Sequence, residues 1–350
     1  MSSSMARDDA VAPERSLRLA VPPVAAMAVV LAGVVIGAVA VGRFGVPLPD
    51  VVRILTSRGE GLSAADQNVV LYVRLPRVLL ALLVGGGLAI AGAALQAAFR
   101  NPLVSPEIIG VSSGASFGGA LALLLGLGTT VLVGAAFGFG LVALVLVFAV
   151  TITRGITPVL MIVLAGVVTG SFFSALVSLT TYVADPYDQL PTIVFWLLGS
   201  VASASYGKVL IAVGPVLAGT LVLLLLRWRV NVLSLGDEEA AALGMRPGRT
   251  RWLLLTAVAL IVAGAVAVSG VVSWVGLVVP HFARMWVGPD HRVLLPVTFL
   301  MGSAYLILID TLARTVTAGE IPLGVLTALL GAPAFFVVLR RHRNRIWDDA

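Results

Sequence analysis

The residues that could carry out chemistry are few in this chain, and they are scattered. Its three histidines, His281, His291 and His342, form no H-E-x-x-H metal site, no G-x-S-x-G segment presents a nucleophilic serine, and cysteine is absent. A P-loop needs G-x-x-x-x-G-K-[ST], but the only lysine, Lys208, is followed by a valine. We therefore expect no enzyme, no ATPase site and no bound cofactor in this chain. An intramembrane hydrolase would need a serine or carboxylate pair within hydrophobic segments.

The composition points to a membrane protein. Of the 350 residues 59% are hydrophobic and 11% are charged, whereas a soluble domain carries about 25% charged residues. The formal net charge of +6 could suggest a nucleic-acid partner in a soluble protein, but here we expect a lipid bilayer and no nucleic acid. The 37 glycines lie within apolar runs, where small residues let helices approach closely.

About 20 apolar residues are needed to cross the hydrocarbon core. On that criterion the sequence predicts an all-α membrane protein with about ten spans in one bundle, and a short apolar helix within 189–206 that does not cross. The expected spans are 19–42, 76–98, 108–127, 130–150, 158–182, 208–227, 252–270, 271–288, 293–316 and 322–340.

An even number of spans places both termini on one side. A basic cluster from Arg340 to Arg345 follows the last span directly, and this predicts that the side is the cytoplasm. In this topology 16 basic residues fall inside and 7 outside. The expected organisation is a cytoplasmic tail at 1–18, a permease domain at 19–340 and a cytoplasmic tail at 341–350, in a bacterial cytoplasmic membrane.

Two ionisable residues lie within expected spans. Asp310 would be functional by default at such a depth, but Arg314 lies four residues further on and can pair with it on one helix face. A structural ion pair argues against a proton relay, and hence against an ion-coupled secondary transporter. That class of transporter is kept as an alternative. His281 follows Pro280, and its ring could bond a carbonyl that the proline frees.

The cytoplasmic segment 228–251 stands out from the apolar background. It predicts a short helix that begins at Asp237, Glu238 and Glu239, where the helix dipole favours acids, and that ends at Gly244 and Pro247. A bare linker is one reading. A docking helix for a cytoplasmic partner is the other, and exposed apolar residues beside the charges favour it.

A second segment, 101–118, combines prolines, glycines and hydroxyl groups. Gly110, Gly114 and Gly118 form overlapping G-x-x-x-G steps. One reading is a turn followed by a tight helix contact, and the same packing role is the default for the steps at Gly134/Gly138 and Gly166/Gly170. The other reading is a water-filled path lined by small and hydroxylated residues. The candidate path residues are Asn101, Pro102, Ser112, Ser113, Ser116, Ser171 and Ser174.

Several motifs, in order along the chain, resemble the FecCD-type permeases of ATP-binding cassette (ABC) importers for iron siderophores, haem and cobalamin. They are R-L-P-R at 74–77, G-A-A-L-Q at 92–96, N-P-L at 101–103 with G-V-S at 110–112, G-L-V-V-P-H at 276–281, D-H-R at 290–292, and E-I-P-L-G at 320–324 with G-A-P at 331–333. The resemblance covers about residues 70–340.

This resemblance implies an assembly of several subunits. A second permease, identical or homologous, would pair with this chain, two cytoplasmic ATPase subunits would bind ATP and Mg²⁺, and an extracytoplasmic substrate-binding protein would deliver the substrate. It implies that Arg74, Arg77 and Arg314 receive glutamates of the binding protein. It also implies that the coupling residues are Leu235, Gly236, Glu239, Ala242, Leu243 and Gly244. The segment V-S-P-E at 104–107 is more similar to siderophore members, while haem and cobalamin remain alternatives.

Overall fold

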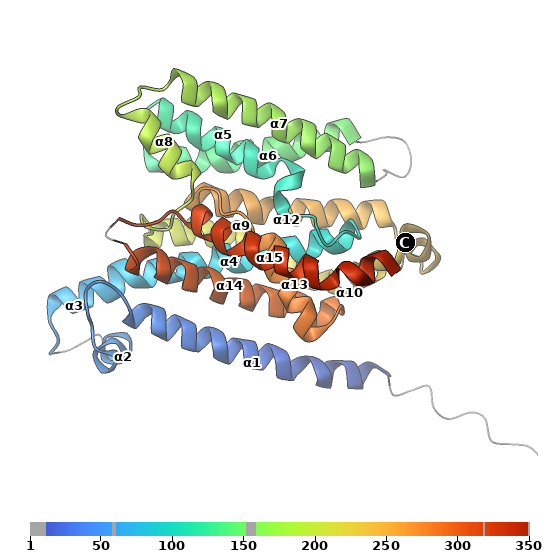
Figure 1. Cartoon of the computed structure of the whole chain (residues 1–350), viewed down its shortest axis with the longest axis horizontal. Coiled ribbons are helices and arrows are strands. Elements are labelled where there is room, and N and C mark those ends of the chain that lie inside the picture. Colours follow the sequence, from blue (N-terminus) through green and yellow to red (C-terminus); the bar gives the residue numbers. More distant parts are fainter. Residues whose placement is uncertain (1–11, 58–60, 152–158, 318, 349–350) are drawn as a thin grey trace, which may run out of the picture.

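The computed structural model describes residues 12–57, 61–151, 159–317 and 319–348, and within these ranges the chain is a helical bundle (Figure 1). Arg7, Arg58 and Arg154, which count in the predicted charge distribution, and most of the tail 1–18 lie outside the described residues. The elements in order are α1 (Ala12–Ala40), α2 (Leu48–Ser57), α3 (Ala64–Asn68), the π-helix η1 (Val69–Arg74), α4 (Leu75–Ala98), the 3₁₀ helix η2 (Pro106–Ile109), α5 (Val111–Leu124), α6 (Thr129–Thr151), α7 (Val159–Val183), α8 (Gln189–Leu197), α9 (Tyr206–Leu225), α10 (Arg227–Leu235), α11 (Asp237–Ala242), α12 (Pro247–Ser269), α13 (Val275–Val287), α14 (His291–Thr315) and α15 (Leu323–Asp348).

Each of the ten expected spans coincides with a helix, although their lengths differ. Within the described ranges, seven helices are long and apolar enough to cross a membrane, and three apolar stretches are shorter, in α5, α13 and Leu323–Val337 of α15. The chain is therefore a multi-pass membrane protein, and the number of ten crossings stays a prediction. The expected short helix within 189–206 is present as the nine-residue α8.

Helix α4 is the centre of the bundle, with nearly all of its residues buried. It packs against α14, α12, α13 and α9. Helices α5, α6 and α7 form a second group, which contacts α12 through α6 and α5 (Figure 1). Close approach depends on glycine: a Cβ at Gly92 of α4 would overlap the backbone of Gly276 in α13. Apolar burial and small-residue contacts together explain how this helix is held.

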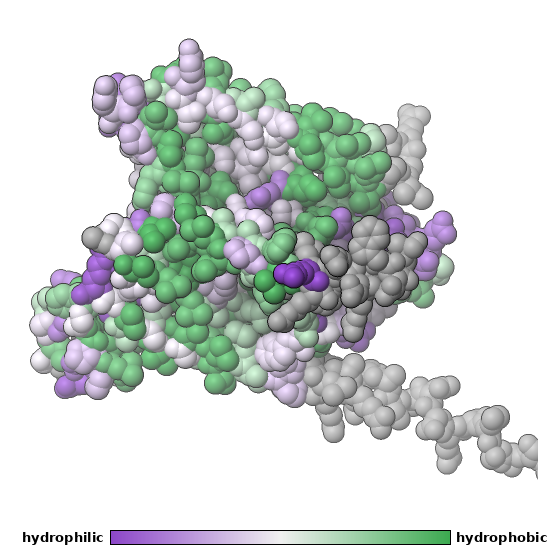
Figure 2. Space-filling view, in the orientation of Figure 1, coloured by the Kyte–Doolittle hydropathy of each residue, from purple (hydrophilic) through white to green (hydrophobic). Residues whose placement is uncertain are grey.

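The surface of the bundle follows the expected membrane pattern. On the face shown, hydrophobic residues cover much of the side of the bundle, and hydrophilic residues gather toward its two ends (Figure 2). The described beginning of α1 and the end of α15 lie at one end, together with α10 (Figure 1). We call this end the terminus end, and the end with α2, α3 and α8 the opposite end.

Two packing predictions have different outcomes. Gly114 and Gly118 do face α6, because a Cβ at either position would collide with the backbone of Phe139 or Ala135. Gly166 likewise packs against Ile108. The prediction for Gly134 and Gly138 is wrong, since both face open space on α6.

Candidate functional site

The opposite end of the bundle contains a cluster of charged side chains centred on Asp310 of α14. Arg77 donates from Nε to both Asp310 oxygens at 2.8 and 2.9 Å, and from its two Nη atoms to Glu320 at 2.8 Å each. Arg314 lies on the other side, with its Nε 3.7 Å from Asp310. The predicted Asp310–Arg314 pair is therefore present, but the sequence missed the closer partner, Arg77.

Two further arginines tie this cluster to the end of α1. Arg74 donates to the carbonyls of Val39, Ala40 and Phe44. Arg43 donates to the carbonyls of Arg314 and Thr317, at 2.8 and 2.5 Å. These bonds satisfy carbonyls that the end of a helix leaves without partners. We call Arg43, Arg74, Arg77, Arg314, Asp310 and Glu320 the arginine cluster.

The structure brings Arg74, Arg77 and Arg314 together at one end of the bundle, but it buries all three to 7% exposure or less, so their expected docking role stays a prediction. Their guanidinium groups are turned inward to partners of the same chain, so they do not snorkel freely to lipid headgroups. Arg43 is exposed and Glu320 half-buried. The Arg77 hydrogen bonds hold the pKa of Glu320 below its ordinary value of 4.5. Four arginines face two carboxylates, which gives the cluster an excess of positive charge, and Arg43 is its exposed arginine.

The segment 228–251, for which the resemblance implies ATPase coupling and which we call the coupling segment, lies at the terminus end and forms the predicted short helix. Helix α11 begins with three acids, and Gly244 ends it in a left-handed conformation with φ of 78°. Leu235 and Leu243, on either side of α11, are 60% and 61% exposed. Glu239, Ala242 and Gly244 are exposed as well, whereas Gly236 is buried. Exposed leucines on a turn beyond the spans are available to a partner protein.

Two contacts that the sequence did not reveal fasten this segment to the spans. Arg251 of α12 is 1% exposed, and it donates to Asp237 of α11 at 2.7 Å and to the carbonyl of Ala98 at the end of α4. Asn231 of α10 donates to Asp290 at 2.6 Å and accepts from the backbone N–H of His291. A displacement of α10 and α11 would therefore pull on α4, α12 and α14. A lone arginine or asparagine gives no sequence signal for such links.

The candidate path residues do not share one surface. Ser112 and Ser116 are buried in the bundle, and Ser113 lies beside Gly170 of α7. Ser171 and Ser174 are exposed on α7, and Asn101 and Pro102 are exposed in the loop after α4. The Asn101 side chain accepts from the N–H of Leu103 at 2.9 Å, as a turn residue does. The structure therefore divides the set into packing positions and exposed positions.

Comparison with known proteins agrees with this architecture. The sequence model of the FecCD transport family matches residues 28–341. The molybdate import system permease protein MolB of Haemophilus influenzae is 44% identical, with 87% of this chain and 91% of that protein covered. A probable iron chelatin transport system permease protein of Helicobacter pylori is 42% identical, with 79% and 83% covered. The solved structure of an inward-facing putative metal-chelate type ABC transporter superposes with a TM-score of 0.84, at 42% identity and with 91% of this chain and 98% of that chain covered. This chain therefore belongs to the FecCD transport family.

Proposed function

We propose that this ABC importer permease translocates a ferric siderophore, delivered by an extracytoplasmic binding protein and driven by two separate ATPase subunits that bind ATP and Mg²⁺. The observation that carries the proposal is the family match over residues 28–341, which includes nearly all of the bundle. The similarity to permeases and to a metal-chelate type transporter supports the same class of function.

The character of α7 supports a large, weakly bound substrate. This helix has no charged residue from Val159 to Val183, and its outer face exposes Ser171 and Ser174 beside large apolar side chains such as Val168 and Phe172, which are 68% and 56% exposed. A rigid chelate needs a wide passage without a tight site, since conduction requires that binding remain weak enough for release. A second permease facing α7 would close such a passage between the two subunits.

Molybdate is the second candidate, because the Haemophilus permease, which is named for molybdate import, is 44% identical to this chain. Uptake into proteoliposomes that contain the complete importer separates the two. We expect a radiolabelled ferric siderophore to accumulate and labelled molybdate, haem and cobalamin not to do so. Accumulation of molybdate in place of the chelate would replace the substrate assignment and leave the importer class intact.

We further propose that the arginine cluster receives acidic residues of the binding protein. Its excess positive charge supports this, and a charged surface accelerates encounter in a salt-dependent manner. Because Arg74, Arg77 and Arg314 also hold the fold, their reversal would confound docking with stability. Arg43 is exposed and bonds to backbone carbonyls, so its reversal leaves no buried carboxylate unpaired, and it is the cleaner probe.

We therefore expect Arg43→Glu to weaken binding-protein stimulation of ATP hydrolysis at low salt and to leave basal hydrolysis unchanged. Arg53→Glu, an exposed arginine on α2 at the same end, is the matched control and should have a smaller effect. Equal stimulation in wild type and in Arg43→Glu across the salt range would contradict docking at this cluster.

A further inference from the structure

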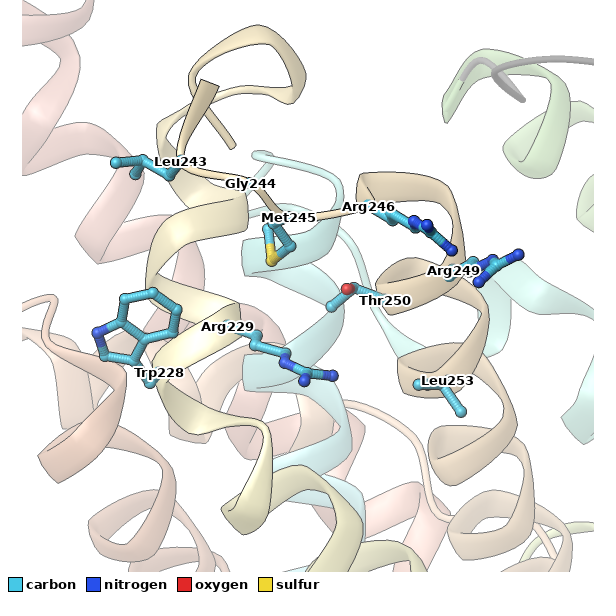
Figure 3. A pocket seen from close by; sticks show the side chains of 9 residues that line it. All are labelled: Trp228, Arg229, Leu243, Gly244, Met245, Arg246, Arg249, Thr250 and Leu253. Carbon is cyan, nitrogen blue, oxygen red and sulfur yellow. The ribbon is translucent and has the colours of Figure 1, made fainter. Parts of the chain in front are cut away.

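A cavity of about 410 Å³ opens at the terminus end between α10 and α12, and only Leu243 and Gly244 of its lining have an expected role in coupling. It is lined by Trp228, Arg229, Leu243, Gly244, Met245, Arg246, Arg249, Thr250 and Leu253. Figure 3 shows Arg229 reaching from α10 toward α12, with Met245 and Thr250 between the two helices. Arg246 and Arg249 lie at the first turn of α12, and in this view their side chains extend away from Arg229.

The three arginines differ from the other arginines described above. Arg77, Arg251 and Arg314 are buried and bonded to carboxylates or carbonyls. Arg229, Arg246 and Arg249 are exposed, and among the described residues none of the ion pairs or side-chain hydrogen bonds involves them. No acidic residue lines the cavity. The lining of one cavity thus carries three arginines without a described counter-charge, and it favours an anion because guanidinium binds phosphate in a bidentate manner.

The depth of the cavity indicates where such an anion comes from. The candidate span of α9 ends at Leu225 and that of α12 starts at Pro247, so the arginines lie where the spans leave the hydrocarbon core. Leu253 lies six residues into α12, about 9 Å along the helix axis, and is 49% exposed. Trp228 is 50% exposed, and tryptophan favours the level of lipid headgroups. Cationic groups above and apolar groups below match an anionic lipid.

We propose that this cavity binds the headgroup phosphate of an anionic phospholipid of the adjoining leaflet, with Arg229, Arg246 and Arg249 as its ligands. The acyl chains lie along Leu253 and the exposed side of α9. Because Leu243, Gly244 and Met245 form part of the wall, the bound lipid contacts the end of the coupling segment. Basic pockets between spans are known sites for anionic headgroups.

The test measures lipid retention by the full-length chain. The purified protein in neutral detergent is titrated with phosphatidylglycerol or phosphatidylcholine of identical acyl chains, and bound lipid is counted by native mass spectrometry. We expect at least one phosphatidylglycerol to be retained preferentially. Each Arg→Gln change at 229, 246 or 249 should reduce this preference about fivefold, and the triple variant should abolish it.

The matched control is Arg100→Gln, Arg227→Gln and Arg340→Gln together, three exposed arginines that do not line the cavity. It should keep the preference, and the thermal stability of both triple variants should equal that of wild type because no described contact is lost in the cavity. A triple Arg→Lys variant keeps the charge and should retain part of the preference even if the glutamine variant fails to fold.

Three results would overturn the proposal. The first is equal retention of the two lipids by wild type, or full preference in the folded glutamine variant. The second is binding of inorganic phosphate by wild type that the glutamine variant loses, without preferential retention of phosphatidylglycerol by either protein, which would assign the site to free phosphate. The third is a glutamine variant that keeps the lipid preference but no longer binds the ATPase subunits when the lipid present is phosphatidylcholine. That result would assign the cavity to an acidic segment of a partner protein.

Discussion

Replacing Arg77 with methionine tests whether the arginine cluster holds the fold together. This change removes the Arg77 Nε donor, which lies 2.8 and 2.9 Å from the two Asp310 oxygens, and leaves a carboxylate of 2% exposure with only the Arg314 Nε at 3.7 Å. Removing one partner of a buried ion pair costs about 3–5 kcal/mol because the remaining charge is buried without compensation. With an unfolding entropy of about 2.1 cal/mol/K per residue over 350 residues, this corresponds to a melting temperature lower by about 4–7 °C.

The measurement is thermal unfolding in detergent, followed by intrinsic tryptophan fluorescence and by size exclusion after heating. Arg53→Met is the matched control, because Arg53 is exposed on α2 and forms no ion pair with a carboxylate among the described residues. The double variant Arg77→Met with Asp310→Asn removes the stranded charge, so it should recover part of the loss. A shift for Arg77→Met as small as that for Arg53→Met would refute the reasoning, and so would a double variant whose loss equals the sum of the two single losses.

Three further predictions concern topology, coupling and pH. Single cysteines at the exposed Ser57, Ser234 and Thr317, in a chain without native cysteine, should label with impermeant thiol reagents from outside at 57 and 317, and at 234 only after permeabilisation; labelling of 234 in intact cells would reverse the orientation. Leu243→Asp should uncouple or detach the ATPase subunits without altering the fold, since apolar anchors dominate the binding energy at a protein interface. The control Leu125→Asp, at a leucine of 60% exposure, should transport normally. Transport by both variants would remove α11 from the coupling role. Because the folded-state pKa of Glu320 lies below its ordinary value of 4.5, its pairing stabilises the fold above that value and is lost as the pH falls through the folded pKa; the difference in melting temperature between wild type and Glu320→Gln should therefore shrink in acid, and a constant difference would contradict the pairing.

The apolar helices of the bundle were predictable because they follow from the composition of the chain. The residues at which several of them begin or end were not. The sequence predicts a span that begins at Pro76, whereas one continuous helical stretch runs from Ala64 to Ala98. Proline lacks an N–H and normally marks a helix start. Here the π-helical turn from Val69 to Arg74 shifts the bonding, as in the bond from the Leu75 N–H to the Val70 carbonyl, and the helix continues through the proline.

The hydropathy pattern also failed to predict the lengths of α5 and α13, because it gave longer spans at both positions. These helices have 14 and 13 residues, or about 20 Å at 1.5 Å per residue, because the backbone leaves the helix at apolar positions. Trp274 precedes α13 with φ of 70°, and Gly270 and Gly288 also have positive φ. A hydropathy window cannot detect a break that consists of apolar residues.

The candidate sites show a similar division between local and long-range signals. The acids that begin α11 and the glycine that ends it are local features, and they predicted this helix. Arg77 and Asp310 are 233 residues apart, so only the fold brings them together. The local i,i+4 rule correctly gave the Arg314 pair but could not reveal the stronger one.

ATP-dependent uptake of a radiolabelled ferric siderophore by proteoliposomes tests the central claim most directly. Vesicles that contain this chain, with and without its ATPase subunits, are supplied with the binding protein outside and with ATP or a non-hydrolysable analogue inside. The account predicts that accumulation requires the permease, the ATPase subunits, the binding protein and hydrolysable ATP together. Accumulation by this chain alone, driven by a proton or sodium gradient, would contradict it and establish an ion-coupled transporter.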